Sequence, residues 1–197
     1  MTQEMKTINF MGIRKFTSVT SIVLVLASIF SIAFFGLKGG LDFTGGTQLE
    51  VLFDKPADLV KVRELLVEKQ LATPVAVLFG SDKEVMIRTQ DQMKVKGQQQ
   101  LAARLAAEGL TLESVERPGR EFDGFADLLV IANSNASELR AKAPFASEIY
   151  GRVNYQQRES STLVAIEKSL DSIYVKQLLA DLEAATGASI ELRSSEF

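Results

Sequence analysis

The feature that most constrains this chain is an uncharged apolar run near its N-terminus. Phe16 to Leu37 is a stretch of 22 residues without Asp, Glu, Lys or Arg. At about 1.5 Å per residue, a helix of that length reaches roughly the ~30 Å of a bilayer core. The sequence therefore predicts a transmembrane helix at residues 16–37.

The charges that flank this run predict its orientation. Lys6, Arg14 and Lys15 precede it, and only Lys38 follows closely. Because positively charged flanks stay on the cytoplasmic side, residues 1–15 are expected in the cytoplasm and the rest of the chain beyond the membrane. In a bacterium, this places the protein in the inner membrane with its C-terminal domains in the periplasm.

A cleaved signal peptide is the alternative interpretation of the same run. Ser31-Ile32-Ala33 has the small-x-small pattern of a cleavage site. The run is longer than the ~7 to 15 residues usual for such peptides, and two phenylalanines follow the possible cut. A membrane anchor is therefore the preferred interpretation.

The composition excludes several classes of function. The 197 residues include no Cys and no His, which removes thiol and imidazole nucleophiles and the usual zinc ligands. A net charge of −3 without a long basic tract argues against nucleic acid as a partner. We expect no catalytic residues, metal, cofactor or small-molecule substrate.

Beyond the membrane, the hydrophobic pattern predicts an α+β fold made of two similar units. The first unit is expected at 38–119 and the second at 120–197, with residues 116–121 as the linker. Each has the order βαββαβ, so we predict two tandem ferredoxin-like domains, each a four-stranded antiparallel sheet with two helices on one face. The predicted strands are 47–53, 74–79, 84–89, 110–116, 127–132, 152–158, 162–168 and 189–194.

An internal repeat supports this division. A shift of 79 positions places Leu49 over Leu128, and a shift of 78 places Gly109 over Gly187. Helices are predicted from Pro56 to about residue 70, up to about 108, at 137–149 and at 172–186. Pro144 should shorten or kink the third of these, because an interior proline loses a helical hydrogen bond.

The segment between the apolar run and the first strand is rich in glycine, which reaches positive φ without a Cβ penalty. One interpretation is a plain connector in which Asp42 and Thr44 cap turns. In the other, Gly45 and Gly46 offer backbone groups to a neighbouring subunit. The candidate joint and interface residues are Gly39, Gly40, Asp42, Phe43, Thr44, Gly45, Gly46 and Thr47.

The motif from Asp42 to Thr47, directly after a first transmembrane helix, resembles the start of SecF, the membrane subunit that assists the bacterial Sec translocon. In that family the motif joins the helix to a small periplasmic ferredoxin-like domain, and the resemblance covers roughly Met11 to Val115. The family continues into five further transmembrane helices with the proton-coupling machinery. This sequence instead begins its second soluble unit, so we do not expect it to drive transport by itself.

Together, these features predict a non-enzymatic, single-pass inner-membrane accessory subunit. The helix would contact the lipid bilayer. The helix and the periplasmic domains would together bind a larger membrane complex, and the resemblance implies that this complex is of the Sec/SecD type. The alternative is a SecF-like export factor whose proton-coupled part comes from another subunit. In that case, exposed strand edges could pair with an extended client polypeptide. An enzyme that uses only carboxylates is a third and weaker alternative.

Overall fold

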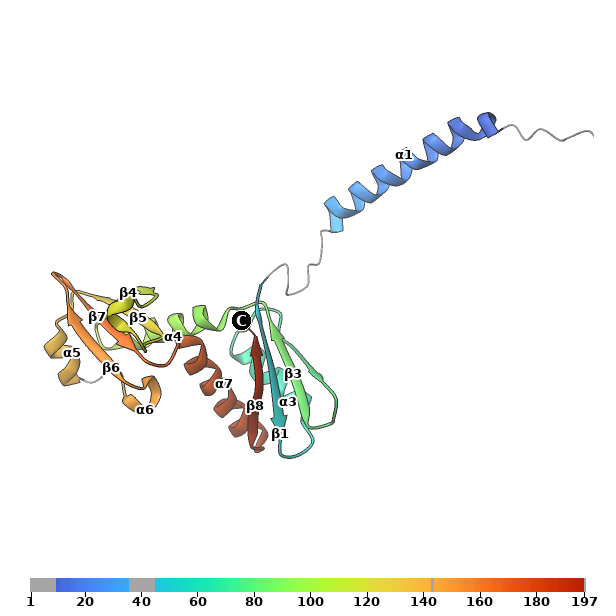
Figure 1. Ribbon diagram of the computed structural model, residues 1–197. Helices are drawn as coiled ribbons and strands as arrows, with labels where there is room; N and C mark the ends of the chain where they lie inside the picture. Colours follow the sequence, from blue (N-terminus) through green and yellow to red (C-terminus); the bar gives the residue numbers. More distant parts are fainter. Residues whose placement is uncertain (1–9, 36–44, 143, 197) are drawn as a thin grey trace, which may run out of the picture. The chain divides into compact units, whose positions relative to one another are not determined.

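The computed structural model describes residues 10–35, 45–142 and 144–196, and Figure 1 labels its elements. The chain divides into two compact units, Met1–Gly40 and Leu41–Phe197. The first contains helix α1, and the second, called the body below, contains the strands and the other helices of the described residues.

Helix α1 spans Phe10–Phe35 and contains one segment, Arg14–Ile32, that is long and apolar enough to cross a membrane. Its exposed large apolar side chains range from 51% exposed at Ile32 to 75% at Phe34. Thr20 and Ser28 donate their hydroxyls to the backbone carbonyls four residues earlier, at 2.9 Å in both cases. The described part of α1 is thus apolar on all sides and has no core of its own to face.

The strands and helices of the body lie close to their predicted places. The predicted helix at 137–149 is divided into two short helices on either side of Pro144, as expected. The elements are β1 (Thr47–Phe53), α3 (Leu59–Glu68), β2 (Val75–Leu78), β3 (Glu84–Thr89), α4 (Met93–Ala107), β4 (Thr111–Glu116), the 3-10 helix η1 (Arg120–Phe122), β5 (Asp127–Ala132), α5 (Ala136–Lys142), α6 (Ser147–Tyr150), β6 (Val153–Gln157), β7 (Ser161–Ile166), α7 (Leu170–Thr186) and β8 (Ile190–Glu196).

These strands form two four-stranded antiparallel sheets, with the orders β2-β3-β1-β8 and β4-β5-β7-β6. Two sheets were expected, but the prediction that each would form from consecutive strands is wrong. The last strand of the chain completes the first sheet beside β1, and β4 completes the second sheet beside β5 (Figure 1). The two halves of the body therefore exchange their final strands.

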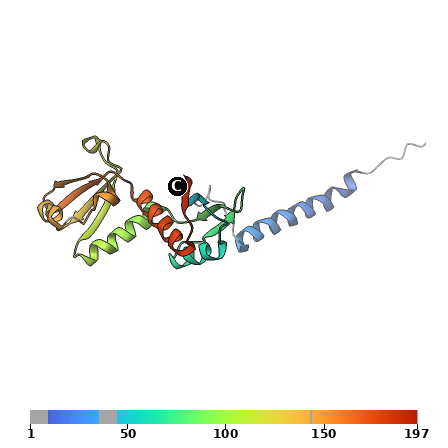
Figure 2. The same ribbon diagram turned by 90° about the horizontal axis from the view of Figure 1, so that it is seen from below.

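The helices before the exchanged strands cross between the two hydrophobic cores. Helix α4 begins with Met93 in the core of the first sheet and continues with Leu101 and Leu105 in the core of the second. Helix α7 runs the opposite way, from Leu170 in the second core to Leu182 in the first. Figure 2 shows these two helices between the sheets. Burying each helix against both sheets ties the halves into one body.

The two sheets can be matched to each other only at a register that differs from the one predicted for the repeat. Leu49 of β1 packs against the helices of the first sheet, and its counterpart on the helix-facing side of the second sheet is Leu129. Leu128, which the shift of 79 had matched to Leu49, lies on the opposite face in a smaller cluster with Phe122. Because side chains alternate along a strand, this one-residue difference reverses the face.

Each exchanged strand carries an irregularity at the same place. In β4 the register shifts between Leu112 and Ser114, which face Ile131 and Val130 of β5. In β8 it shifts opposite Val51 and Glu50 of β1, which are 80 positions before Ile131 and Val130. A β-bulge bends and twists the strand that carries it. The two final strands are therefore shaped alike, although each serves the other half of the chain.

Candidate functional site at the junction

The junction is the segment between α1 and β1, and its described residues are the last three of the motif, Gly45, Gly46 and Thr47. Gly45 has φ of 69° and Gly46 has φ of 144°, conformations that residues with a Cβ rarely adopt. Thr47, the first residue of β1, is fully buried. The other predicted joint residues lie outside the described residues: Gly39, Gly40, Asp42, Phe43 and Thr44.

Thr47 anchors the start of β1 to the turn that begins the exchanged part of the chain. Its hydroxyl donates to the backbone carbonyl of Asp91, two residues before α4, at 2.9 Å. The Asp91 carboxylate accepts a hydrogen bond from the Ala72 N–H at 2.6 Å and forms an ion pair with the Lys96 ammonium at 3.3 Å. The start of β1 is thus hydrogen-bonded to the turn that precedes the crossing helix α4.

Asp127 holds the corresponding place in the second sheet. It is the first residue of β5, as Thr47 is of β1, and it is fully buried. One carboxylate oxygen accepts the N–H of Leu170 at the start of α7, at 2.8 Å, and the other pairs with Lys94 of α4 at 2.6 Å. A carboxylate at a helix N-terminus is favoured by the helix dipole. Asp127 therefore joins both crossing helices to the second sheet.

The two crossing helices meet at a glycine. A Cβ placed on Gly97 of α4 would lie 2.5 Å from the carbonyl oxygen of Leu170 in α7. No real Cβ approaches an oxygen that closely, so only glycine allows this contact without movement of one helix. Sequence reasoning noticed neither Gly97 nor Asp127. A lone charge at the start of an apolar strand and a glycine inside a helical pattern were the available signals.

Two features hinder the edge strands of the body from pairing with another chain: hydrogen bonds from arginine side chains and β-bulges. Arg63 of α3 donates to the Ala76 carbonyl on edge strand β2, at 2.8 and 3.2 Å, and Arg140 of α5 donates to the Tyr155 carbonyl on edge strand β6, at 3.2 Å. The other two edges are the bulged strands β4 and β8. Capping groups, bulges and charges all reduce pairing with another chain.

One exposed ion pair of the body depends on pH. The Glu167 carboxylate accepts the Arg152 backbone N–H at 2.8 Å and its Nε at 3.1 Å. These hydrogen bonds, the backbone one first, hold the pKa of Glu167 below its usual 4.5. The contact therefore stabilises the fold above about pH 4.5 and loses this effect as the pH falls through the lower pKa of the folded state.

No group of three or more His, Cys, Asp or Glu side chains that could hold a metal occurs among residues 10–35, 45–142 and 144–196. The acidic residues described above are used in contacts within the body.

Comparison with known proteins identifies this junction. Residues 30–57 match the family described as the SecD/SecF GG motif. SecF of Vibrio alginolyticus is 45% identical over 93 residues, which are 47% of this chain and 30% of that protein. SecF of Pseudomonas aeruginosa is 42% identical over 82 residues, or 42% of this chain and 27% of that protein.

A third relative matches a longer part of the chain. SecF of Acidaminococcus fermentans is 37% identical over 112 residues, which are 52% of this chain and 38% of that protein. The chain thus spans about a third of the length of the curated relatives that it matches. No solved structure matches it.

The family match begins inside α1, crosses the glycine-rich junction and ends just after β1. It therefore covers the motif on which the resemblance to SecF was based. By this motif and these relatives, the chain is similar to SecF over the matched segments.

Proposed function

We propose that this chain is a non-enzymatic, single-pass accessory subunit of the bacterial inner membrane. The observation that carries the proposal is the position of the SecD/SecF GG motif, which joins a helix of spanning length to the first strand of the body. The relatives are named protein translocase subunits, so we infer that this chain acts in protein export beside a larger complex of the Sec/SecD type.

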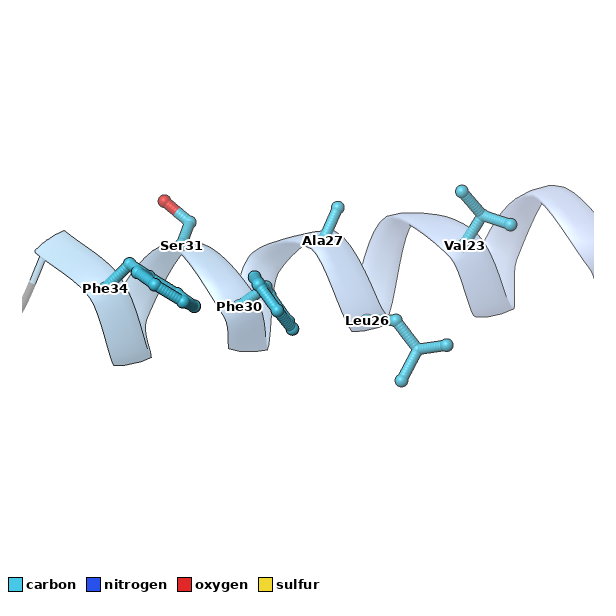
Figure 3. A pocket seen from close by; sticks show the side chains of 6 residues that line it. All are labelled: Val23, Leu26, Ala27, Phe30, Ser31 and Phe34. Carbon is cyan, nitrogen blue, oxygen red and sulfur yellow. The ribbon is translucent and has the colours of Figure 1, made fainter.

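Helix α1 offers a side suited to a partner span. Val23, Ala27 and Ser31 follow one another at intervals of four residues, beside Leu26, Phe30 and Phe34 (Figure 3). The Phe30 and Phe34 rings stack with their centroids 4.9 Å apart. Small residues let transmembrane helices approach closely. We propose that this side of α1 packs against a helix of the larger complex.

The charge pattern supports an orientation with the body in the periplasm. Arg14 and Lys15 lie at the N-terminal end of the candidate span, and positive charges next to a span favour the cytoplasmic side. We also propose that segments 38–119 and 120–197 are two copies of a ferredoxin-like unit that have exchanged their last helix and strand. The matching sheet orders and bulges of the two halves support this origin.

Isolation of the native membrane assembly tests this proposal. We expect the chain to co-purify in mild detergent with a larger membrane protein complex, and Ala27→Leu to reduce the recovered partner several-fold because it adds bulk where helices pack. Val25→Leu, outside this side of α1, is the matched control and should have no effect. Recovery of only a free monomer in several gentle preparations would count against the proposal.

The second candidate function is a SecF-like export factor that handles the emerging polypeptide, with proton coupling supplied by another subunit. The translocase names of the relatives favour it. The protected edges of the body weigh against strand pairing as its way of binding a client. Cross-links from Gln48 or Gln156 to secreted precursors during translocation would support it, and their absence would weaken it.

A further inference from the structure

Each sheet of the body has an outer face, which is the face opposite its helices. In the second sheet, the loop between β4 and β5 folds back over this face and carries the 3-10 helix η1. The aromatic ring of this loop packs there in one hydrophobic cluster, which consists of Phe122, Leu128, Val130, Leu163 and Ala165. The outer face of the second sheet is therefore covered by a segment that directly precedes its central strand.

On the first sheet, Met86 of β3 occupies the outer face. Its neighbours along the strand, Val85 and Ile87, belong to the first core, so the Met86 side chain points the other way. Only 7% of Met86 is exposed, yet it belongs neither to the two cores nor to the cluster of Phe122. The hydrophobic clusters of the described residues therefore do not explain why Met86 is buried.

The strand pairing makes Met86 the counterpart of Leu163 in the second sheet. Glu50 of β1 faces Met86, and Val130 of β5, which stands 80 positions after Glu50, faces Leu163. Leu163 is 2% exposed and lies in the cluster with Phe122. The corresponding place on the first sheet is therefore one that an aromatic ring would fill.

The junction carries an aromatic residue at the matching point of the sequence. A shift of 79 positions places Phe43 over Phe122 and Gly45 over Gly124. Both glycines have positive φ, 69° at Gly45 and 83° at Gly124, a conformation that a Cβ disfavours. The two turns into the central strands thus share a backbone feature as well as the aromatic residue before it.

The length of the junction allows Phe43 to reach Met86. Phe43 stands four residues before Thr47, and four residues span at most about 14 Å. Met86 lies beside Glu50, which is three residues beyond Thr47, or about 10 Å along the strand. A chain that folds back at Gly45 therefore has enough length to place the ring over Met86.

We propose that Phe43 docks on the outer face of the first sheet and covers Met86, as Phe122 packs with Leu163 in the second sheet. The contact removes two apolar side chains from water, which favours it. Phe43 is then a positioning residue that holds the start of β1 from the outer face, while the Thr47 hydroxyl binds the turn before α4. This role lies within the body and does not depend on the function proposed above.

Cysteine labelling of the full chain tests this contact, both in detergent and in nanodiscs. The chain has no native Cys, so the Met86→Cys variant reacts with a maleimide at one site. We expect slow labelling, and at least a tenfold faster rate when Phe43→Ala is added, because the ring no longer covers the site. Phe43→Leu keeps an apolar cover and should raise the rate less than threefold. Leu41→Ala, in the same segment, is the matched control and should leave the rate unchanged.

A second site on the same face controls for general opening of the sheet. Val77 is 39% exposed, so Val77→Cys should label rapidly with or without Phe43→Ala. The factor by which Phe122→Ala accelerates labelling of Leu163→Cys is the reference for the size of the effect.

Three results would overturn the proposal. Rapid labelling of Met86→Cys with Phe43 in place would show that the site is open in the isolated chain. Protection that persists after Phe43→Ala would show that other side chains cover it. Protection in nanodiscs but not in detergent would assign the cover to lipid.

Discussion

Gly97→Leu should destabilise the body strongly. The new side chain would collide with the Leu170 backbone, which a Cβ alone would approach to 2.5 Å. Forced overpacking of this kind typically costs up to about 3 kcal/mol, or roughly 6–12 °C in Tm for a body of this size. Helix α4 would have to move away from α7, and both cores would lose contacts.

Tyrosine fluorescence during thermal unfolding in detergent measures this effect. The chain has no Trp, and its three Tyr residues, Tyr150, Tyr155 and Tyr174, all lie in the body. Gln99→Leu, at an exposed position two residues further along α4, is the control and should change stability by less than about 0.5 kcal/mol. Equal Tm values for the two variants would show that α4 and α7 do not meet at Gly97.

Asp127→Ala should produce the second large loss of stability. It leaves the buried N–H of Leu170 and the ammonium of Lys94 without their common partner. Hydrogen bonds to charged groups contribute about 1.5–3 kcal/mol each. Since the Lys94 side chain is 39% exposed and can be solvated, we expect a total loss of about 2–3 kcal/mol.

A double-mutant cycle separates the two contacts of Asp127. Asp127→Asn keeps an acceptor for Leu170 but removes the charge, and Lys94→Met removes the ion pair alone. We expect Asp127→Asn to lose less stability than Asp127→Ala, and its effect to shrink when Lys94→Met is also present. Additive effects would mean that Asp127 and Lys94 do not interact.

The sequence predicted the elements of the body well and their pairing poorly. Alternating apolar residues located β1, a continuous apolar run located β5, and Pro144 placed the break between α5 and α6, because such signals are local. The choice of partner for a final strand is not local. Leu101 and Leu105 of α4 have counterparts in Leu178 and Leu182 of α7, so either helix fits either sheet by its pattern.

The candidate site, like the fold, could be predicted from the sequence only in part. The motif from Asp42 to Thr47 could be recognised by its resemblance to SecF, and Gly45 and Gly46 have the positive φ that glycine allows. The roles of Asp91 and Asp127 could not be predicted, because each depends on contacts made across the exchange. An acid near a helix start is common in any soluble domain.

Because of the exchange, the strand that follows the junction pairs with strands from both halves of the body. The chain enters the body at Thr47 and continues as β1, which is paired on one side with β3 and on the other with β8. Since β8 comes from the end of the chain, a displacement at the junction would act on both halves at once. The start of β1 is therefore bound to strands from both halves of the body.

The most direct test of this account is disulfide formation within the exchanged sheet. The chain has no native Cys, so introduced pairs can be read without background. Glu50 of β1 faces Ser194 of β8, whereas Ser114 is the equivalent position in β4. The account predicts an intramolecular disulfide in the Glu50→Cys, Ser194→Cys variant and none in the Glu50→Cys, Ser114→Cys variant. The reverse result would show that each half keeps its own final strand.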